Sequence, residues 1–471
     1  MNFEKIYVSG DWVDSIAKDR IAVENPVNHE ILAYVPACHD GDVDRAVNAA
    51  YDAFESWSKL TVMERAPYFR KFQVELQGMY DEILATLRAE LGVNESYGKK
   101  GHVDRRITSV SDYLEQALSM NLVENYDDMK VIYEPYGVVA CLTPWNYPMG
   151  QIMSKLLPAV LTGNTVVIKP SQLTPLTAYY IVEAAHRAGF PKGVINLVPG
   201  RGGEVGNALA AHPLVSMVSF TGSTKGGKEV YQIASKTCKK VVLELGGKSA
   251  AIAMDREHLP KAVSSVLSRV YNNVGQTCSA WTRLFVPKNY LEEAEELVIS
   301  CTEKYEFGDP TTGPNVIGPL ASRKQYDKVT SYINKGIEEG ARLVVGKPYE
   351  AFSESYTVGP TVFSDVENDM VIAREEIFGP VLCIIPFEDL EDAIAMANDN
   401  EYGLSGAVYG PIEEAVEVAK RLRTGEVSIN GYFSPKPSPF GGFKQSGIGR
   451  EGGIYGIKEY LQAKAIYIPK E

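Results

Sequence analysis

The chain has 471 residues, of which 45% are hydrophobic and 23% are charged, values typical of a globular protein. One core rarely serves so long a chain, so we expect two or three domains. The formal net charge of −13 argues against nucleic acid and against an anionic membrane surface as partners. Residues 1–5 show no signal-peptide pattern, and no apolar run approaches the roughly 20 residues that span a bilayer, so we expect a cytoplasmic protein.

The cysteines and histidines predict neither a disulfide framework nor a metal site. No Cys-x-x-Cys pair occurs, and the six histidines lie far apart in the sequence. The six cysteines therefore indicate reduced thiols: Cys38, Cys141, Cys238, Cys278, Cys301 and Cys383.

The N-terminal part shows helical patterns with recognisable start signals. Asp42 is placed to cap a helix whose apolar residues recur with helical spacing as far as Trp57. Thr61 and Glu64 form a capping-box pattern, and Gly92 is a plausible end for the helical region that they open.

Between residues 137 and 245, short runs rich in valine and isoleucine alternate with helical segments. Buried strands that alternate with helices are typical of a doubly wound parallel sheet, so we predict an α/β fold. The predicted strands are residues 137–142, 165–169, 193–198, 215–220 and 239–245, and the predicted helices are residues 176–188, 204–211 and 226–235. Ligands of such sheets bind at the carboxyl ends of the strands.

Two glycine-containing turns are candidates for phosphate binding. The spacing Gly200-x-Gly202-x-x-x-Gly206 departs from the usual dinucleotide fingerprint and is weak evidence alone. Thr221-Gly222-Ser223 ends a strand and opens a helix, where amides favour a diphosphate. An ordinary strand-to-helix turn with Ser223 as N-cap explains the same residues.

A helical run of residues 259–271 precedes Cys278, and a second α/β pattern follows it. The predicted helices of this pattern are residues 291–305 and 323–340, and its predicted strands are residues 343–345, 381–386 and 425–430. Residues 463–468 alternate like a strand, and a strand at this end invites pairing with another subunit.

Three side chains together indicate acyl chemistry on a carbonyl. Cys278 follows the helix of residues 259–271 among small polar neighbours, although an average cysteine is simply a buried hydrophobe. Glu244 lies in the apolar run 241–245, where a carboxylate is costly to bury. Asn146 offers an amide donor.

Five motifs in the same order make the sequence resemble the aldehyde dehydrogenase superfamily nearly end to end. Residues 143–148 resemble its Pro-Trp-Asn motif, 243–249 its Glu-Leu-Gly-Gly-Lys motif, and 275–278 its nucleophile motif. Residues 376–380 resemble the Glu-Ile-Phe-Gly-Pro motif, and 439–451 the Pro-Phe-Gly-Gly signature that ends in Gly-Arg-Glu.

The resemblance implies a role for each matching residue. It implies Cys278 as nucleophile, Glu244 as general base, Asn146 as oxyanion donor and Lys155 as a proton relay. The implied cofactor residues are Thr143, Trp145, Lys169, Ser171, Gln172, Gly202, Thr221, Gly222, Ser223, Leu245, Gly246, Glu376 and Phe378. The implied substrate tunnel consists of Tyr147, Gly150, Gln151, Ser154, Thr277, Ser279 and Phe440.

The resemblance also implies a domain plan and an assembly. The plan is a dinucleotide-binding domain of residues 1–116 and 137–246, a catalytic domain of residues 247–449, and a small β oligomerisation flap of residues 117–136 and 450–471. A homodimer or homotetramer is expected.

The chemistry follows from the nature of an aldehyde, which has no leaving group. A thiolate must first form a tetrahedral adduct, whose oxyanion Asn146 and the backbone N–H of Cys278 would stabilise. Hydride loss to a nicotinamide leaves a thioester, and its hydrolysis requires an activated water. Transfer to coenzyme A would need no such base, so Glu244 favours the hydrolytic type that releases a free acid.

Two departures from the family pattern bear on specificity. A glutamate where this chain has Gln172 would bond the adenosine ribose and repel a 2′-phosphate, so we expect NAD with tolerance of NADP, which Arg201 nearby could aid. Ser154 replaces a frequent aromatic residue and suggests a wider, more polar entrance, unless side chains of the loop of residues 432–440 fill the space.

Several functions remain open from the sequence. A semialdehyde, betaine-aldehyde or glyceraldehyde-3-phosphate specialist fits the same motifs, although no cation cluster for a phosphate is evident. A catalytically idle family member and a cysteine hydrolase without a dinucleotide are the alternatives from other classes.

Overall fold

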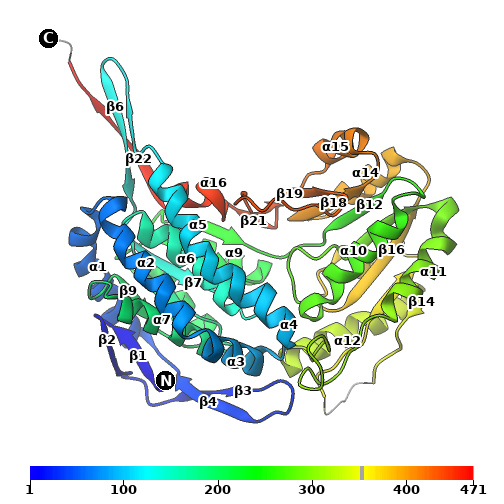
Figure 1. The fold of residues 1–471 in the computed structure, drawn as a ribbon, viewed down its shortest axis with the longest axis horizontal. Coiled ribbons are helices and arrows are strands. Elements are labelled where there is room, and N and C mark those ends of the chain that lie inside the picture. Colours follow the sequence, from blue (N-terminus) through cyan, green and yellow to red (C-terminus); the bar gives the residue numbers. More distant parts are fainter. Residues whose placement is uncertain (351–354, 470–471) are drawn as a thin grey trace.

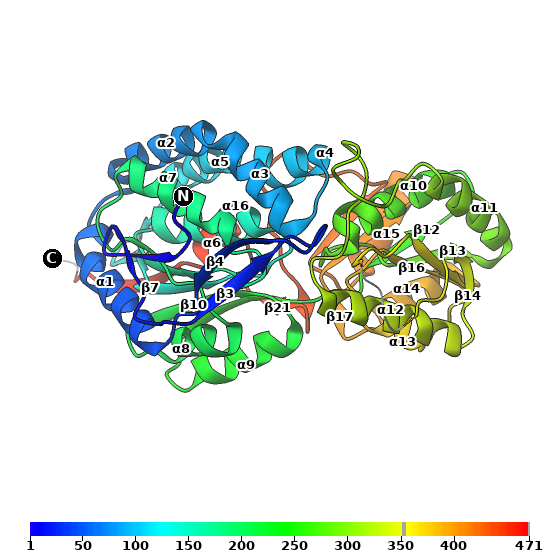
Figure 2. The same ribbon diagram turned by 90° about the horizontal axis from the view of Figure 1, so that it is seen from below.

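The computed structural model describes residues 1–350 and 355–469, which form two α/β bodies side by side and a projecting β-ribbon (Figures 1 and 2). The N-terminal body is built on a mixed sheet in which β7 to β11 run parallel to their neighbours, whereas β1, β2 and β21 are antiparallel. The order of its strands is β2 (Asp11–Asp14), β1 (Lys5–Val8), β9 (Ile195–Leu197), β8 (Thr165–Lys169), β7 (Val138–Leu142), β10 (Val215–Thr221), β11 (Lys240–Glu244) and β21 (Gly447–Ile448).

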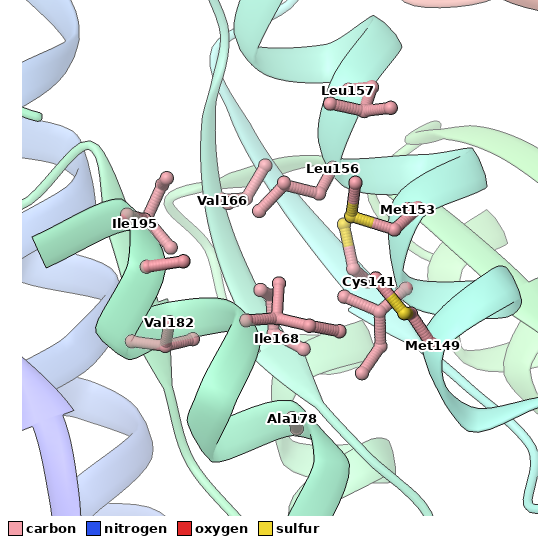
Figure 3. Close-up of a cluster of buried hydrophobic side chains, with 14 of the residues drawn as sticks. Cys141, Met149, Met153, Leu156, Leu157, Val166, Ile168, Ala178, Val182 and Ile195 are labelled. Carbon is pink, nitrogen blue, oxygen red and sulfur yellow. The ribbon is translucent and has the colours of Figure 1, made fainter. Parts of the chain in front are cut away.

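Helices cover both faces of this sheet, because alternate residues of its central strands are all apolar and each face buries one set. The first face packs on α1 (Asp40–Ser58), α8 (Asn207–Ala211) and α9 (Thr224–Ser235). The second face packs on α2 (Val62–Gly78), α3 (Tyr80–Leu91), α5 (Arg105–Ser119), α6 (Pro148–Leu161) and α7 (Leu176–Ala188). Cys141 and Ile168 of neighbouring strands meet Met153 of α6 and Val182 of α7 there (Figure 3).

The second body is a separate, mostly parallel sheet with its own core. The order of its strands is β14 (Arg342–Val345), β15 (Thr361–Ser364), β16 (Val381–Phe387), β13 (Arg283–Pro287), β12 (Ala250–Ala253), β18 (Ser405–Tyr409) and β19 (Glu426–Ile429). Its helices are α10 (Leu259–Tyr271), α11 (Leu291–Thr302), α12 (Arg323–Glu338), α13 (Val371–Arg374), α14 (Leu390–Asn398) and α15 (Ile412–Arg421).

Smaller elements complete the chain. The projecting ribbon is the antiparallel sheet β22 (Leu461–Tyr467), β6 (Met129–Pro135) and β5 (Val123–Asn125), which carries the C-terminal end outward (Figure 1). The remaining elements are β3 (Arg20–Glu24) paired with β4 (Ile31–Pro36), β17 (Tyr402–Gly403) paired with β20 (Phe443–Lys444), α4 (Glu95–Tyr97), α16 (Gly453–Lys458), the π-helical turns Gly98–Asp104 and Gly202–Gly206, and the 3-10 turns Asn272–Gly275 and Lys288–Tyr290.

The predicted fold class is confirmed, and one local prediction is wrong. Asp42 does not cap the first helix, because α1 begins at Asp40 with His39 as its N-cap. Asp42 is fully buried and accepts hydrogen bonds from Ser15 Oγ (2.7 Å) and Ile16 N (2.9 Å), so it anchors the preceding loop instead.

No helix among the described residues is both long and apolar enough to span a bilayer. Over the same residues, no cluster of three or more His, Cys, Asp or Glu side chains is arranged to hold a metal ion. All six cysteines are free thiols.

Candidate active site

The segment that carries Cys278 has an unusual backbone. Asn273, Val274 and Gly275 have φ angles of 53°, 56° and 71°, a left-handed run that is unfavourable for a β-branched valine. Burial of Val274 holds this conformation. A Cβ at position 275 would lie 2.0 Å from the carbonyl oxygen of Gly379, so only glycine fits there. The nucleophile segment is therefore fixed against the predicted cofactor segment 376–380.

Asn146 lies against the same segment, as its predicted role requires. Its Nδ2 donates to Gln276 O over 2.9 Å, and Asn273 Nδ2 donates back to Asn146 O over 3.0 Å. This hydrogen bond occupies one of the two Nδ2 protons of Asn146. The second proton remains available to an oxygen near the thiol.

Cys278 is half-buried in an electronegative environment. Burial raises the pKa of its thiol well above the ordinary value, and the nearby Glu244, Glu376 and Glu426 raise it further, whereas the backbone N–H of Ser279 lowers it. The free thiol is thus the resting form, and attack on a carbonyl requires a group that takes its proton.

Glu244 is the carboxylate predicted to act as general base, and it acts electrostatically on the thiol of Cys278. It ends β11, is 2% exposed, and neither carboxylate oxygen has a hydrogen-bond partner within the described residues. Burial and then the charge of Glu451 raise the pKa of Glu244 well above its usual range, whereas Lys155 and Arg450 lower it. A carboxylate without partners is free to bind a proton from a thiol or a water.

Lys155 belongs to a buried network behind Glu244. Its Nζ donates to Thr221 Oγ1 over 2.6 Å and forms an ion pair with Glu451, both side chains being almost inaccessible. The resemblance implied Lys155 as a proton relay and Thr221 as a cofactor residue, whereas Glu451 was not among the predicted site residues. The signal was present, since Glu451 ends the quoted signature of residues 439–451.

Two of the residues predicted to hold a dinucleotide, Lys169 and Thr221, end the parallel strands β8 and β10. Buried Lys169 donates to Pro170 O and to Gly200 O (3.1 Å), which leaves one ammonium proton free, and burial lowers its pKa to about 8. A groove of about 600 Å³ has apolar residues of α8 and α9 within a polar rim: His39, Asp40, Gly203, Glu204, Asn207, Ala208, Ala211, Ile233 and Lys236. A purine ring with an attached ribose fits this composition.

At the N-terminus of α9, where phosphate binding was predicted, the structure shows the ordinary capping role of Ser223. Ser223 is the N-cap of this helix and accepts from Gly226 N over 3.1 Å, the ordinary role considered above. Gly222 N donates to Glu244 O over 3.0 Å. Gly202 is exposed, with open space around its Cα, and Ser171 and Gln172 are half-buried.

Glu376, a predicted cofactor residue, is held against the segment that follows Glu244. It accepts from Gly247 N over 2.9 Å, and a Cβ at Gly246 would lie 2.7 Å from its carboxylate. Burial raises the pKa of Glu376. Phe378 meets Trp145 edge to face at 5.5 Å, while Thr143 Oγ1 is buried without a partner in the described structure. Leu245 packs on Gly227 of α9. These residues fit a dinucleotide between two carboxylate-bearing segments.

The predicted tunnel residues lie on two sides of the thiol. The hydroxyl of Tyr147 lies 2.7 Å from Thr277 Oγ1 and 2.9 Å from the hydroxyl of Tyr97. The side chain of Arg106 lies against Gly150, where a Cβ would fall 2.7 Å from its Nε, so this guanidinium fills the space that glycine leaves.

The other tunnel residues are less constrained. Gln151 and Ser154 are half-buried, with Ser154 Oγ donating to Gln151 O over 3.1 Å. Phe440 is also half-buried and exchanges two backbone hydrogen bonds of 2.7 Å with Glu451, which ties the tunnel to the buried network.

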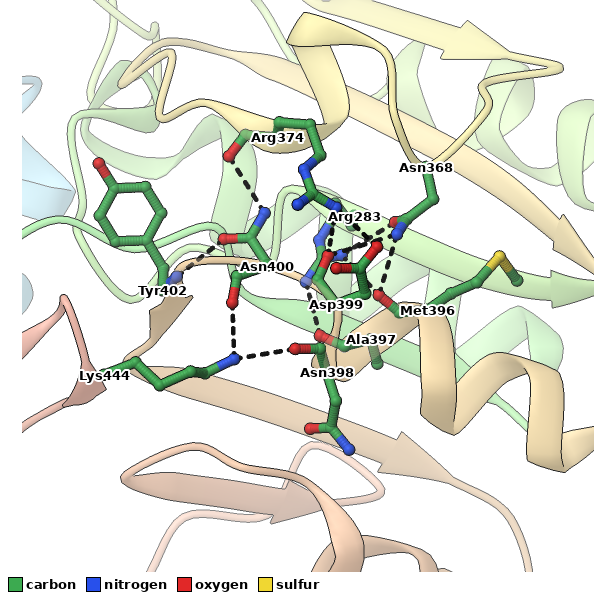
Figure 4. Close-up of polar contacts among 10 residues, drawn as sticks. All are labelled: Arg283, Asn368, Arg374, Met396, Ala397, Asn398, Asp399, Asn400, Tyr402 and Lys444. Carbon is green, nitrogen blue, oxygen red and sulfur yellow. Dashed lines mark hydrogen bonds and ion pairs between the residues drawn. The ribbon is translucent and has the colours of Figure 1, made fainter.

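A buried arginine ties together the segments around the site (Figure 4). Arg283 of β13 donates to Lys248 O (3.0 Å), to Ala397 O at the end of α14 (3.0 Å) and to Asn368 Oδ1 (3.1 Å). Lys444 donates to the next carbonyls, Asn398 O and Asn400 O. The strand after Cys278 is thereby fastened to the segment after Glu244.

Comparison with known proteins identifies the family. The sequence profile of the Aldehyde dehydrogenase family matches residues 12–466. The chain belongs to the aldehyde dehydrogenase family. A relative from Staphylococcus haemolyticus, also assigned to the aldehyde dehydrogenases, is 40% identical over 468 residues, which cover 99% of this chain and 98% of the relative.

Three solved structures of aldehyde dehydrogenases and related enzymes have the same fold. A mutant aldehyde dehydrogenase C from Pseudomonas syringae, in complex with NAD+ and octanal, is 41% identical with a TM-score of 0.96, covering 99% of this chain and 97% of that one. An NADP-dependent enzyme from E. coli is 35% identical with a TM-score of 0.94 (99% and 98% covered). The betaine aldehyde dehydrogenase of Staphylococcus aureus, in complex with NAD+, is 34% identical with a TM-score of 0.94 (99% and 96% covered).

Proposed function

We propose that this aldehyde dehydrogenase oxidises an aldehyde to the free carboxylic acid with NAD(P)+, through a thiohemiacetal and a thioester on Cys278. The observation that carries the proposal is Glu244. Its buried carboxylate has no hydrogen-bond partner within the described residues, and it acts electrostatically on the thiol of Cys278. Such a base is needed for hydrolysis of the thioester.

The first half of the reaction uses the nucleophile segment. Glu244 takes the proton of Cys278, and the thiolate attacks the aldehyde carbon. The second Nδ2 proton of Asn146 and the backbone N–H of Cys278 stabilise the resulting oxyanion, each such donor being worth about 3 kcal/mol. A bound nicotinamide dinucleotide would accept the hydride from the former aldehyde carbon.

In the second half of the reaction, Glu244 is the base that activates water. Glu244 first releases the proton of Cys278 to solvent. Its carboxylate then removes a proton from the water that attacks the thioester, and the acid leaves as Cys278 regains a thiol proton from Glu244. The ion pair of Lys155 with Glu451 lies behind Glu244 and sets its proton affinity, since the two charges act on it in opposite directions.

For the cofactor we propose NAD+ as the preferred form, with NADP+ accepted. The neutral side chain of Gln172 does not repel a 2′-phosphate. Arg201 stands 3.8 Å from the carboxylate of Glu204, so its charge is largely balanced by a neighbour and offers little extra attraction. Both cofactors occur among the related enzymes described above.

The proposed dimer or tetramer uses the projecting sheet. The strand β22 pairs with β6 along one edge, and its other edge has no strand beside it in the described chain. Ile466, Tyr467 and Ile468 are exposed on it, a combination typical of an edge that pairs with another chain. The domain limits given above are part of the same proposal. Light scattering after size-exclusion chromatography measures the assembly.

The test of function is the formation of NAD(P)H with a panel of aliphatic, aromatic, amino and carboxylated aldehydes. We expect turnover with at least one aldehyde, release of free acid without coenzyme A, and no turnover by Cys278→Ala. Absence of turnover across the panel by the folded protein would contradict the proposal.

A second candidate is a betaine aldehyde dehydrogenase. The similarity to the Staphylococcus aureus enzyme supports it, and Tyr147, whose hydroxyl lies 2.7 Å from Thr277 Oγ1 beside the thiol, is an aromatic residue suited to a quaternary ammonium group. A preference for a trimethylammonium aldehyde over an uncharged aldehyde of equal length would favour this candidate.

A further inference from the structure

Arg106 is a cation without an acidic partner beside the thiol. It begins α5 with Arg105, and its Nε is buried without a hydrogen bond in the described chain. The ion pairs of the described residues also leave it out, so no carboxylate lies within 4.0 Å of it. Buried charges in proteins are normally paired, because an unpaired one loses its hydration without compensation.

Two hydroxyl groups, those of Tyr147 and Thr277, lie between Arg106 and the nucleophile. Its side chain lies on Gly150, one turn into α6, and it acts electrostatically on Tyr97 and Tyr147. The hydroxyl of Tyr147 lies 2.7 Å from Thr277 Oγ1, and Thr277 directly precedes Cys278. A group bound at Arg106 is therefore close enough to belong to the same molecule as a carbonyl at the thiol.

Arg269 is a second cation, on the other body, and one of its ring contacts is Trp281, three residues after Cys278. It lies on α10 and packs on two rings, with its Cζ 4.8 Å from the centre of Trp281 and 4.0 Å from that of Phe433. It has no ion pair or hydrogen bond from its guanidinium in the described part of the chain. Arg269 and Arg106 both lower the pKa of Tyr97, which burial raises. Two guanidinium groups thus act on one hydroxyl.

One acid acts on Arg269 but not on Arg106. Glu426 at the start of β19 is half-buried, and burial raises its pKa, while Arg269 and Arg105 lower it. Glu426 also acts on the thiol of Cys278, whereas Arg106 has no carboxylate within 4.0 Å among the described residues. The unpaired charge of Arg106 attracts an anion.

Resting on the oxidation of aldehydes proposed above, we propose that Arg106 and Arg269 form an anion subsite, and that the substrate is an aldehyde with a carboxylate at its far end. Guanidinium groups bind carboxylate and phosphate oxygens through paired N–H donors. A phosphorylated aldehyde shares this chemistry and forms a separate arm of the test. No sequence motif marks this pair, because Arg106 and Arg269 lie 163 positions apart by their numbers.

The test compares aldehydes of equal length that differ only in their far end. Butanal, hexanal and octanal are each assayed against the corresponding ω-oxocarboxylate, with glyceraldehyde 3-phosphate and a trimethylammonium aldehyde as further arms. We expect kcat/KM for the best ω-oxocarboxylate to exceed that of its alkanal by about tenfold or more. Added salt should raise KM for the charged substrate and leave KM for the alkanal unchanged.

Variants assign the effect to the two arginines. Arg106→Gln and Arg269→Gln should each lower kcat/KM for the ω-oxocarboxylate by about tenfold to hundredfold, mainly through KM, and change the alkanal by less than about threefold. Lys261→Gln, an exposed charge on α10 near its N-terminus, is the matched control and should change either substrate by less than about twofold. Equal loss for both substrates, or a wild-type preference for the alkanal, overturns the anion subsite. A higher kcat/KM for glyceraldehyde 3-phosphate or for the trimethylammonium aldehyde than for every ω-oxocarboxylate overturns the assignment of a carboxylate as the far end of the substrate.

A binding measurement separates this proposal from the proposed function. Adipate should raise the Tm of the wild type, and hexanoate should not, while Arg106→Gln should abolish the adipate effect. If no aldehyde is oxidised, the proposed function fails while adipate still reports on the subsite. If alkanals are oxidised and adipate leaves Tm unchanged, the oxidation stands and the anion subsite fails.

Discussion

Replacing Glu244 with glutamine tests its role in the two halves of the reaction. The amide has the shape of the carboxylate, and the carboxylate makes no hydrogen bond in the described structure, so the change removes the base without breaking a contact. A general base contributes about 10² to 10⁴ in rate, equivalent to about 3 to 5 kcal/mol of activation free energy. We therefore expect Glu244→Gln to lower steady-state turnover by that factor.

Rapid mixing reveals which step is lost. In the proposed reaction Glu244 takes the thiol proton of Cys278 as well as a proton of water, so the variant should lose the fast phase of NAD(P)H formation together with steady-state turnover. A fast phase of about one NAD(P)H per active site, followed by slow turnover as the thioester accumulates, would show that Glu244 serves hydrolysis alone. Unchanged steady-state turnover would refute the reasoning from its geometry.

The pH dependence of the hydrolysis rate is an independent test of the role of Glu244. Hydrolysis needs Glu244 ionised, and its pKa is raised by burial and by Glu451, so the hydrolysis rate should rise with pH through the folded-state pKa. Glu451→Gln removes a negative charge and releases Lys155 from its ion pair, and both changes lower the pKa of Glu244. The acid limb of the rate profile should move to lower pH, and a move to higher pH would contradict this electrostatic account.

Three further substitutions test binding and stability. The carboxylate of Glu90 accepts hydrogen bonds from the backbone amides at the start of α7, and burial raises its pKa to about 7. Its contribution to the free energy of unfolding is therefore present at low pH and is lost as pH rises through 7, by up to about 3 kcal/mol. The Tm advantage of wild type over Glu90→Gln should shrink from pH 5 to pH 8, and growth of that advantage would contradict this sign. Gln172→Glu should raise the preference for NAD+ over NADP+ in kcat/KM, and an unchanged ratio would exclude contact with the ribose. Gly275→Ala should lower stability by about 2 to 5 kcal/mol in denaturant titration, because its Cβ would meet Gly379 O and its φ is left-handed; a wild-type midpoint would contradict that close contact.

Local signals were sufficient for much of the fold. The strand of residues 165–169 and the helices of residues 176–188 and 259–271 have the predicted bounds, since each is a periodic apolar run between breaking residues. Thr61 and Glu64 form the predicted capping box. Asp42 misled because its spacing fits a cap, whereas its partners Ser15 and Ile16 come from a distant loop.

The candidate site depends more on contacts between distant residues. The motif residues Cys278, Glu244 and Asn146 are brought together by the ends of different elements, an arrangement that the resemblance implied and periodicity alone could not. The cations of Arg106 and Arg269 have no motif, and the helices that carry them, α5 and α10, belong to different bodies. Left-handed Val274 is also unpredictable, because valine has no local preference for that conformation.

The close contact at Gly275 constrains how the site can move. Gly379 lies against Gly275 on one side, and a Cβ at Gly379 would lie 2.6 Å from Val329 of α12 on the other. The segment with Glu376 is therefore clamped between the thiol segment and a helix, and Glu376 can adjust to a dinucleotide by side-chain rotation but hardly by a backbone shift. A displacement of α12 would therefore shift Gly379 and Gly275 with it, and would move the sulfur of Cys278 and the carboxylate of Glu376 together.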